Sequence, residues 1–303
     1  MLDRIRIATR QSKLALWQAN FIRDQLRSYH PGLEVELVGM TTKGDRWLDS
    51  PLSEVGGKGL FVKELEAAML DGLADIAVHS MKDVPAVLPD GFIMPVMAYR
   101  GPVEDMLITR AGDLRSLPQG ARIGSSSLRR QAQLLTIRPD LMVASIRGNV
   151  GTRLAKLDAG EFDAIVLARA GIERLDLDVG DAHILGVDLS LPAPGQAALG
   201  VECLVRGEVE ELLEPLQDAE VSACVRSERA VSAGFGADCS LPIAAYATKL
   251  DDQITLRALV ANADGSRIVR TEKVGVNVEK LGAAVVAELF DAGAQEILDS
   301  LAD

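Results

Sequence analysis

The sequence predicts an α/β protein that ends in a small α+β domain, and three observations support this prediction. Along the first two thirds of the chain, short apolar runs typical of buried strands alternate with segments of helical periodicity. This alternation is typical of sheets with helical crossover connections, so we expect parallel sheets. After PAPGQAALG at 192–200 the pattern changes to strands joined by a tight turn. A length of 303 residues predicts about two or three domains.

The N-terminal elements follow from periodicity and from breakers. Ser12 is placed to cap a helix, and HPG at 30–32 ends it. The polar connection at 42–59 is long enough to predict a functional or mobile loop. The elements expected here are a strand at 4–9, a helix after Ser12, a strand at 33–40, a helix at 60–70 and a strand at 74–79.

The rest of the chain is assigned in the same way. Ala263-Asp264-Gly265 predicts a turn between two strands. The elements expected are strands at 121–124, 141–147, 163–168 and 198–205, helices at 125–137, 219–233 and 278–292, a turn and helix within 148–160, and an antiparallel sheet built from 242–250 and 253–274.

Composition and charge exclude several classes of protein. A net charge of −12 argues against nucleic-acid binding through a basic face. No apolar run approaches the roughly 20 residues of a membrane span, and the N-terminus does not resemble a signal peptide. We therefore expect a cytoplasmic enzyme that binds neither membrane nor nucleic acid.

The three cysteines differ in their surroundings. Cys203 and Cys224 lie in apolar segments and are expected to be buried, whereas Cys239 lies in the loop GFGADCSLP and is expected to be accessible. Neither the cysteines nor the three histidines have metal-ligand spacing, so no metal site is predicted. From the residues alone, Cys239 is equally compatible with a chemical role and with none.

Cations gather where predicted strands end. Lys82 follows one strand, Arg129 and Arg130 open the next helix, and Arg147 and Arg153 flank the turn after another strand. Ligands of open α/β sheets bind beyond the carboxyl ends of the strands, and free N–H groups at a helix start favour anions. We therefore predict a cleft for a ligand with several carboxylates or phosphates, although any single arginine is also compatible with an exposed helix position.

HSMKDVP at 79–85 allows two interpretations. Lys82 and Asp83 are either a solvated strand end or a cation and an acid placed over a substrate. Two phosphate-binding motifs fail: GGKG at 56–59 lacks the first glycine and the hydroxyl residue of a P-loop, and GFGADC lacks the third glycine of a dinucleotide fingerprint.

Several stretches together resemble the porphobilinogen deaminase family, also called hydroxymethylbilane synthases. They follow one another along essentially the whole chain: ATRQSKLALWQ (8–18), GGKGLFVKELE (56–66), HSMKDVP (79–85), GSSSLRRQ (124–131), IRGNVGTRL (146–154) and Cys239 in its loop.

The resemblance implies three domains in a monomer. Two are similar to the α/β lobes of periplasmic binding proteins, the first made of 1–97 with a returning segment at 197–216 and the second of 98–196. The third, 217–303, is a small α+β domain that carries the cofactor cysteine.

The resemblance also implies the reaction: four porphobilinogen molecules condense, each losing ammonia, into the linear tetrapyrrole hydroxymethylbilane of porphyrin biosynthesis. The chain grows on a dipyrromethane cofactor held by a thioether, by position at Cys239. Asp83 is then the catalytic acid–base group, which stabilises the azafulvene that forms when ammonia leaves. The other positions implied are Lys82, Arg129, Arg130, Ser125 and Ser127 for the cofactor, and Arg10, Ser12, Arg147, Arg153, Lys58 and Phe61 for substrate.

A few residues depart from the family pattern. Ala237 and Asp238 precede the cysteine where glycine is usual, and Ser240 with Leu241 separates it from the proline. An aspartate beside the thiol disfavours the thiolate and is expected to slow cofactor attachment. Arg169 stands where a small or apolar residue is usual, and an added carboxylate contact is expected of it.

Two other classes of protein share parts of the pattern. A non-catalytic anion-binding protein explains the cleft but gives Cys239 and Asp83 no role. A ligand-sensing regulator requires a DNA-binding helix-turn-helix, which the sequence does not contain. The intact mass of the purified protein distinguishes an enzyme with a covalent cofactor from both.

Overall fold

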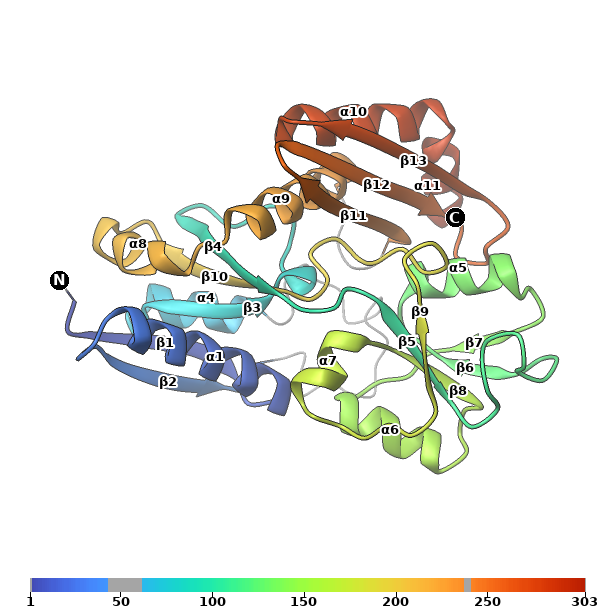
Figure 1. The fold of residues 1–303 in the computed structure, drawn as a ribbon, viewed down its shortest axis with the longest axis horizontal. Coiled ribbons are helices and arrows are strands. Elements are labelled where there is room, and N and C mark those ends of the chain that lie inside the picture. The colour runs from blue at the N-terminus through green and yellow to red at the C-terminus, as the bar shows by residue number, and fades with distance from the viewer. Residues whose placement is uncertain (1, 43–61, 237–240, 303) are drawn as a thin grey trace.

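A computed structural model describes residues 2–42, 62–236 and 241–302 of the chain. Figure 1 shows two lobes side by side, each built on a five-stranded sheet, with a third, smaller unit packed over them. We call them the first lobe, the second lobe and the C-terminal unit, each defined by its sheet.

The sheet of the first lobe combines strands from two distant parts of the chain. Its order is β2-β1-β3-β10-β4, with β1 parallel to β2 and β3, and β10 antiparallel to β3 and β4. Its strands are β1 (Arg4–Arg10), β2 (Glu34–Met40), β3 (Ile76–Ser80), β4 (Phe92–Arg100) and β10 (Ala198–Leu204). Helical segments are α1 (Lys13–Tyr29), α4 (Lys63–Leu70), η1 (Met81–Asp83), α8 (Gly207–Leu213) and η2 (Glu214–Leu216).

The sheet of the second lobe has the corresponding mixed arrangement. Its order is β7-β6-β8-β5-β9, with β6 parallel to its neighbours and β5 antiparallel to both of its own. Its strands are β5 (Asp105–Thr109), β6 (Arg122–Gly124), β7 (Met142–Ala144), β8 (Ala164–Ala168) and β9 (Ala182–Leu185). Its helices are α5 (Leu128–Ile137), α6 (Val150–Asp158) and α7 (Arg169–Arg174).

The C-terminal unit packs helices on a three-stranded antiparallel sheet of order β11-β12-β13. Its elements are β11 (Ile243–Leu250), β12 (Gln253–Ala261), β13 (Ile268–Gly275), α9 (Ala219–Gly234), α10 (Val278–Asp291) and α11 (Ala294–Ala302). The chain therefore crosses twice between the lobes, from β4 to β5 and from β9 to β10 (Figure 1).

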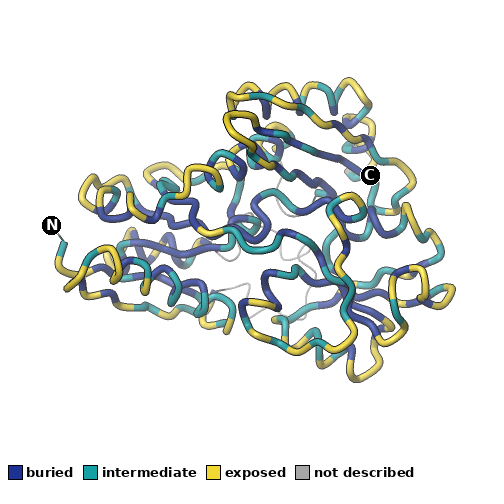
Figure 2. The backbone as a smooth tube through the Cα atoms, in the orientation of Figure 1, coloured by how far each residue is buried: buried dark blue, intermediate teal, exposed yellow. Residues whose placement is uncertain are grey.

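Each unit has its own core. In the first lobe Ile5, Ile7 and Ile76 of the sheet pack on Ile22 and Leu26 of α1, and all five have no exposed surface. Figure 2 shows the buried backbone along the strands and the exposed backbone on outer helices and loops. Burying each large apolar side chain stabilises the fold by about 1.5–3 kcal/mol, and this free energy holds the helices on their sheets.

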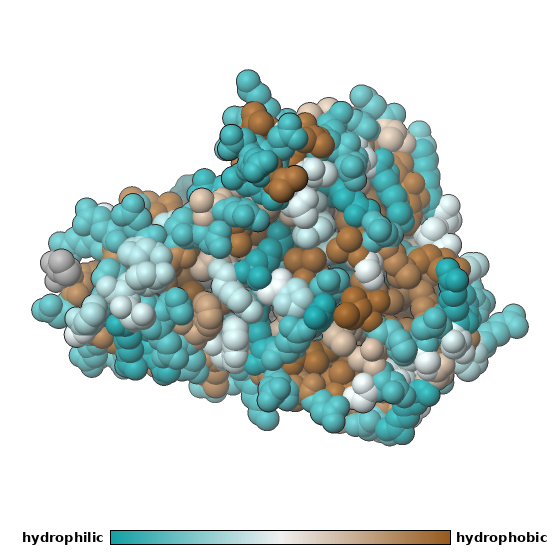
Figure 3. Space-filling model, viewed as in Figure 1, coloured by the Kyte–Doolittle hydropathy of each residue, from teal (hydrophilic) through white to brown (hydrophobic). Residues whose placement is uncertain are grey.

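The surface follows the same division. In Figure 3 hydrophilic residues cover the outer edges, while apolar residues gather near the middle, over the region where β5, β9 and α7 lie in Figure 1. No helix within the described ranges is long and apolar enough to cross a bilayer.

The predicted fold class is confirmed: two α/β lobes precede a small α+β unit with an antiparallel sheet. The expectation of parallel sheets holds for the pairs of β1 and of β6 but is wrong for β10 and β5, which lie antiparallel beside the central strands β3 and β8. The helix expected at 125–137 begins only at Leu128, and the strand expected at 141–147 is limited to 142–144. Strands β4, β5 and β9 and the last helix α11 were not expected from the sequence.

Candidate active site

HSMKDVP lies where the central strand β3 ends. Its residues 81–83 form the single 3₁₀ turn η1, closed by a hydrogen bond of 3.3 Å from the Val84 N–H to the Met81 carbonyl. Met81 and Val84 are buried, with 1% and 6% of their surface exposed, whereas Lys82 and Asp83 between them are partly exposed. The turn therefore buries its two apolar ends and presents the cation and the carboxylate together.

Lys82 faces charges of the second lobe. Burial lowers the pKa of its ammonium group, and the positive charges of Arg130 and Arg129 lower it further, whereas Asp83 and Asp105 raise it. Burial and like charges both disfavour a cation. The end of β3 in the first lobe and the start of α5 in the second therefore share one electrostatic environment.

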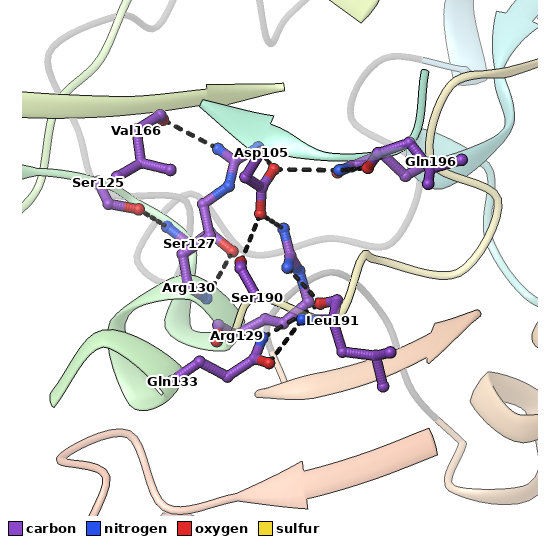
Figure 4. A network of polar contacts seen from close by, with 11 residues as sticks. Asp105, Ser125, Ser127, Arg129, Arg130, Gln133, Val166, Ser190, Leu191 and Gln196 are labelled. Carbon is purple, nitrogen blue, oxygen red and sulfur yellow. Dashed lines mark hydrogen bonds and ion pairs between the residues drawn. The ribbon is translucent and has the colours of Figure 1, made fainter. Parts of the chain in front are cut away.

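Arg129 and Arg130 are both buried and converge on Asp105 (Figure 4). Arg129 donates from Nη2 to Asp105 Oδ2 at 2.8 Å and from Nη1 to the Leu191 carbonyl at 2.5 Å. Arg130 donates from Nη2 to Asp105 Oδ1 at 2.7 Å and from Nη1 to the Val166 carbonyl at 3.1 Å. Both guanidinium groups are thus fixed by partners from distant parts of the chain.

Asp105 is a residue that the sequence analysis missed. Its carboxylate also accepts from Ser190 Oγ at 2.9 Å and from Gln196 Nε2 at 3.0 Å. Burial raises the pKa of this carboxyl, but the two guanidinium groups outweigh burial and hold the pKa well below its usual range. The available signal was an aspartate at the start of the apolar run DMLIT, an unfavourable place for a charge without a partner.

The serines before α5 serve local structure. Ser127 caps the helix by accepting from the Arg130 N–H at 3.4 Å, and Ser125 Oγ accepts from the Ser127 N–H at 3.2 Å. Ser126 Oγ donates to the Ile146 carbonyl at 2.6 Å and ties the start of α5 to the segment that follows β7. These contacts orient the first turn of α5, from which both arginines project.

Arg147 and Arg153 lie on either side of the turn that leads into α6. Arg153 donates from Nε to the Gly148 carbonyl at 2.8 Å. Burial, with the positive charges of Arg130 and Arg147, lowers the pKa of Arg153 to about 10, whereas Asp83 raises it. Burial also lowers the pKa of Arg147. Arg153 therefore belongs to the same cation cluster as Arg130 and interacts electrostatically with the carboxylate of Asp83 on η1.

Arg10 and Ser12 lie at the same edge of the first sheet as η1. Arg10 ends β1, and β1 pairs in parallel with β3, so both strands point their carboxyl ends in one direction. Ser12 caps α1, because its side chain accepts from the Ala15 N–H at 3.3 Å.

Three predicted site residues and their neighbours lie outside the described residues. These are Lys58, Phe61 and Cys239, together with Ala237, Asp238 and Ser240 of the cysteine loop.

The other two cysteines are buried, as expected. Burial raises the pKa of the Cys203 thiol to about 12 and that of Cys224 to about 11. Because the thiolate is the nucleophile, both are chemically inert at neutral pH.

Arg169 has protein partners. Its guanidinium contacts Glu173 at 2.6 Å and Glu104 at 3.6 Å on the second lobe. The positive charge of Arg169 is therefore paired with two carboxylates of the protein itself.

The cation cluster suits a polycarboxylate. Lys82, Arg129, Arg130, Arg147 and Arg153 bring more positive charge to this region than Asp83 and Asp105 neutralise. The buried Nε atoms of Arg129 and Arg130 also have no hydrogen-bond partner among the described residues. An anion with several carboxylates relieves this repulsion. In the described ranges, no three His, Cys, Asp or Glu side chains are grouped to hold a metal ion.

Two family models match the chain. The model described as "Porphobilinogen deaminase, dipyromethane cofactor binding domain" matches residues 5–214, and "Porphobilinogen deaminase, C-terminal domain" matches residues 222–291. The chain belongs to the porphobilinogen deaminase family. The resemblance noted in the sequence is thereby confirmed over nearly the whole chain.

Membership of the porphobilinogen deaminase family defines the activity. The protein is a transferase that condenses porphobilinogen into hydroxymethylbilane in tetrapyrrole biosynthesis, and its cofactor is a dipyrromethane. Neither alternative from the sequence, a non-catalytic binding protein or a ligand-sensing regulator, describes this family.

Solved structures similar to the chain include extracellular and periplasmic binding proteins. A probable amino-acid ABC transporter extracellular-binding protein from Bacillus subtilis is 12% identical, with TM-score 0.45, over 71% of this chain and 90% of its own. The periplasmic aliphatic sulphonate binding protein of Escherichia coli is 13% identical, with TM-score 0.44, over 96% and 88%. These similarities, all below 0.5 in TM-score, say nothing about the ligand of this chain.

Proposed function

We propose that Asp83 is the catalytic acid–base group of this hydroxymethylbilane synthase. As the acid, it gives a proton to the amino group of porphobilinogen that departs as ammonia. As the carboxylate, it stabilises the positive charge left on the pyrrole nitrogen and takes up the proton released when the new carbon–carbon bond forms. Its position on η1, held between two buried residues, supports this role.

The observation that supports the proposal most strongly is the cluster of cations from both lobes around this carboxylate. Each pyrrole carries an acetate and a propionate, so both substrate and cofactor are anions. We assign Lys82, Arg129, Arg130, Ser125 and Ser127 to the cofactor, and Arg10, Ser12, Arg147, Arg153, Lys58 and Phe61 to the substrate. The electrostatic coupling of Lys82 to Arg129 and Arg130 supports a shared site across the lobes.

We propose Cys239 as the attachment point of the dipyrromethane, through a thioether. When bound, the cofactor supplies the pyrrole end on which the product chain grows. The high pKa of the Cys203 and Cys224 thiols supports the assignment, because neither is nucleophilic at neutral pH.

We further propose three domains, 1–97 with 197–216, 98–196 and 217–303, in a monomeric cytoplasmic protein. The membership of β10 in the first sheet supports the discontinuous first domain.

Intact mass spectrometry tests the cofactor assignment. Wild-type protein should carry the mass of two deaminated porphobilinogen units, and Cys239→Ser should carry none. Cys203→Ser and Cys224→Ser are the matched controls and should retain the full added mass. An added mass that persists in Cys239→Ser and disappears in either control would refute the assignment.

A further inference from the structure

The back of the η1 turn rests on helix α9 of the C-terminal unit. Val225 of α9 has no exposed surface and belongs to the same buried cluster as Met81 and Val84, with Met97 and Ala198. Met81 and Val84 flank Lys82 and Asp83 in the sequence. The apolar contact with α9 therefore fixes both ends of the segment that presents the charged pair.

Arg229 lies one helical turn beyond Val225 and holds the segment that follows Asp83. Its Nη1 donates to the Val84 carbonyl at 3.1 Å, and its Nη2 donates to the carbonyls of Pro85 and Ala86 at 2.6 and 3.1 Å. Residues four apart lie on one face of a helix, so Val225 and Arg229 contact the turn together. Burial lowers the pKa of Arg229, and Glu202 raises it.

The neighbouring residue Glu228 holds the other side of the turn indirectly. Its buried carboxylate accepts from the Gly195 N–H at 2.7 Å and forms two hydrogen bonds with Arg100, at 2.8 and 3.0 Å. Gly195 packs so closely on the turn that a Cβ there would lie 2.8 Å from Met81 Cβ and 3.3 Å from the backbone nitrogen of Lys82. Gly195 on one side and Arg229 on the other therefore restrict the movement of η1.

We propose that Arg229 is a positioning residue for the condensation, which holds the carbonyls of 84–86 so that Asp83 keeps its productive place at the end of β3. The proposal rests on the role proposed for Asp83. It connects the reaction to the C-terminal unit, because α9 carries Arg229 and ends at Gly234, five positions before Cys239.

The chemistry of arginine explains why this residue type occupies the position. A guanidinium presents several N–H donors in a rigid plane and here reaches three successive carbonyls. A lysine ammonium donates from one nitrogen only, so it cannot span these three carbonyls as a guanidinium does. Released carbonyls let the backbone beside Asp83 shift, and a displacement of about 1 Å in a catalytic group costs about 10²-fold in rate.

The test compares turnover in Arg229→Met, Arg229→Lys and the matched control Arg226→Met. Arg226 lies on the same helix and is exposed. Turnover is expressed per molecule of holoenzyme, whose fraction is measured by intact mass. A variant that carries less cofactor therefore does not show a falsely low kcat. Arg229→Met should lower kcat by about 10²-fold and change KM by less than about threefold, because substrate-binding groups are untouched. Arg229→Lys should fall between this variant and wild type, and Arg226→Met should match wild type.

A double-mutant cycle with Asp83→Asn separates positioning from general loss of structure. If Arg229 acts through Asp83, Arg229→Met should slow the Asp83→Asn enzyme by less than about threefold. An undiminished loss of about 10²-fold in that background would overturn the proposal, because the effect would then be independent of Asp83. Should Arg229→Met not fold, the same cycle is run with Arg229→Lys, and wild-type kcat in that variant would overturn the proposal.

The cycle also distinguishes this inference from the role proposed for Asp83. Wild-type kcat in Asp83→Asn would overturn the role of Asp83 and this inference with it. Wild-type kcat in Arg229→Met beside a slow Asp83→Asn would overturn this inference alone.

Discussion

Replacing Asp105 with asparagine removes the negative charge that Arg129 and Arg130 share inside the second lobe. The carboxylate has no exposed surface and contacts the two arginines at 2.8 and 2.7 Å. Asparagine keeps the shape and one acceptor oxygen, but it places an amide N–H₂ where one of these donors now binds. Two buried guanidinium groups would then face each other without a counter-charge.

The expected loss of stability follows from the burial of this group. Removing one partner of a buried ion pair costs about 3–5 kcal/mol, because the remaining charge stays buried without compensation. A folded domain is stable by only about 5–15 kcal/mol, so Asp105→Asn should leave the second lobe marginal. The exposed pair of Asp158 with Arg110 supplies the control, since solvent screens it and Asp158→Asn should change stability little.

The same contact sets a dependence on pH. The folded-state pKa of Asp105 is depressed, so its stabilisation is complete above the unfolded value of about 3.9 and is lost as pH falls toward the folded value. The difference in stability between wild type and Asp105→Asn should therefore be constant at neutral pH and should narrow only below about pH 4.

Urea denaturation at pH 7 and in acid, in a Cys239→Ser background without cofactor, measures both effects. If Asp105→Asn were no less stable at pH 7 than Asp158→Asn, the buried carboxylate would not stabilise the two arginines, which would refute this prediction.

Three further predictions concern the site. Asp83→Asn should lower turnover by about 10²–10⁴-fold without lowering the melting temperature, and a slow variant that also melts early would point to a structural role instead. Arg153→Gln, made in a cofactor-free background, should raise the melting temperature because it removes a partly buried cation whose pKa is lowered to about 10. In the holoenzyme it should weaken substrate binding, seen as a higher KM. Gly195→Ala should lower kcat because its Cβ would displace Met81, whereas Gly32→Ala, which meets no atom within 4 Å, should leave kcat at the wild-type value.

Local chemistry in the sequence predicted many of the elements. Ser12 and Ser127 were expected at helix starts, and both cap a helix. Lys82 lies directly beyond β3, as expected, whereas Arg147 lies three positions beyond the end of β7. Hydrophobic periodicity and capping depend on residues close in sequence, so they can be predicted from the sequence alone. The motifs around these same residues were enough to indicate the family.

The tertiary structure alone decided how these elements combine. It placed β10 antiparallel between β3 and β4, although 98 or more positions separate β10 from both. It paired Asp105 with Arg129 and Arg130, and it brought Arg229 to carbonyls up to 145 positions earlier in the chain. Such contacts carry no local signature, because the free energy that selects them comes from burying charges and strands against partners that only the folded chain brings together.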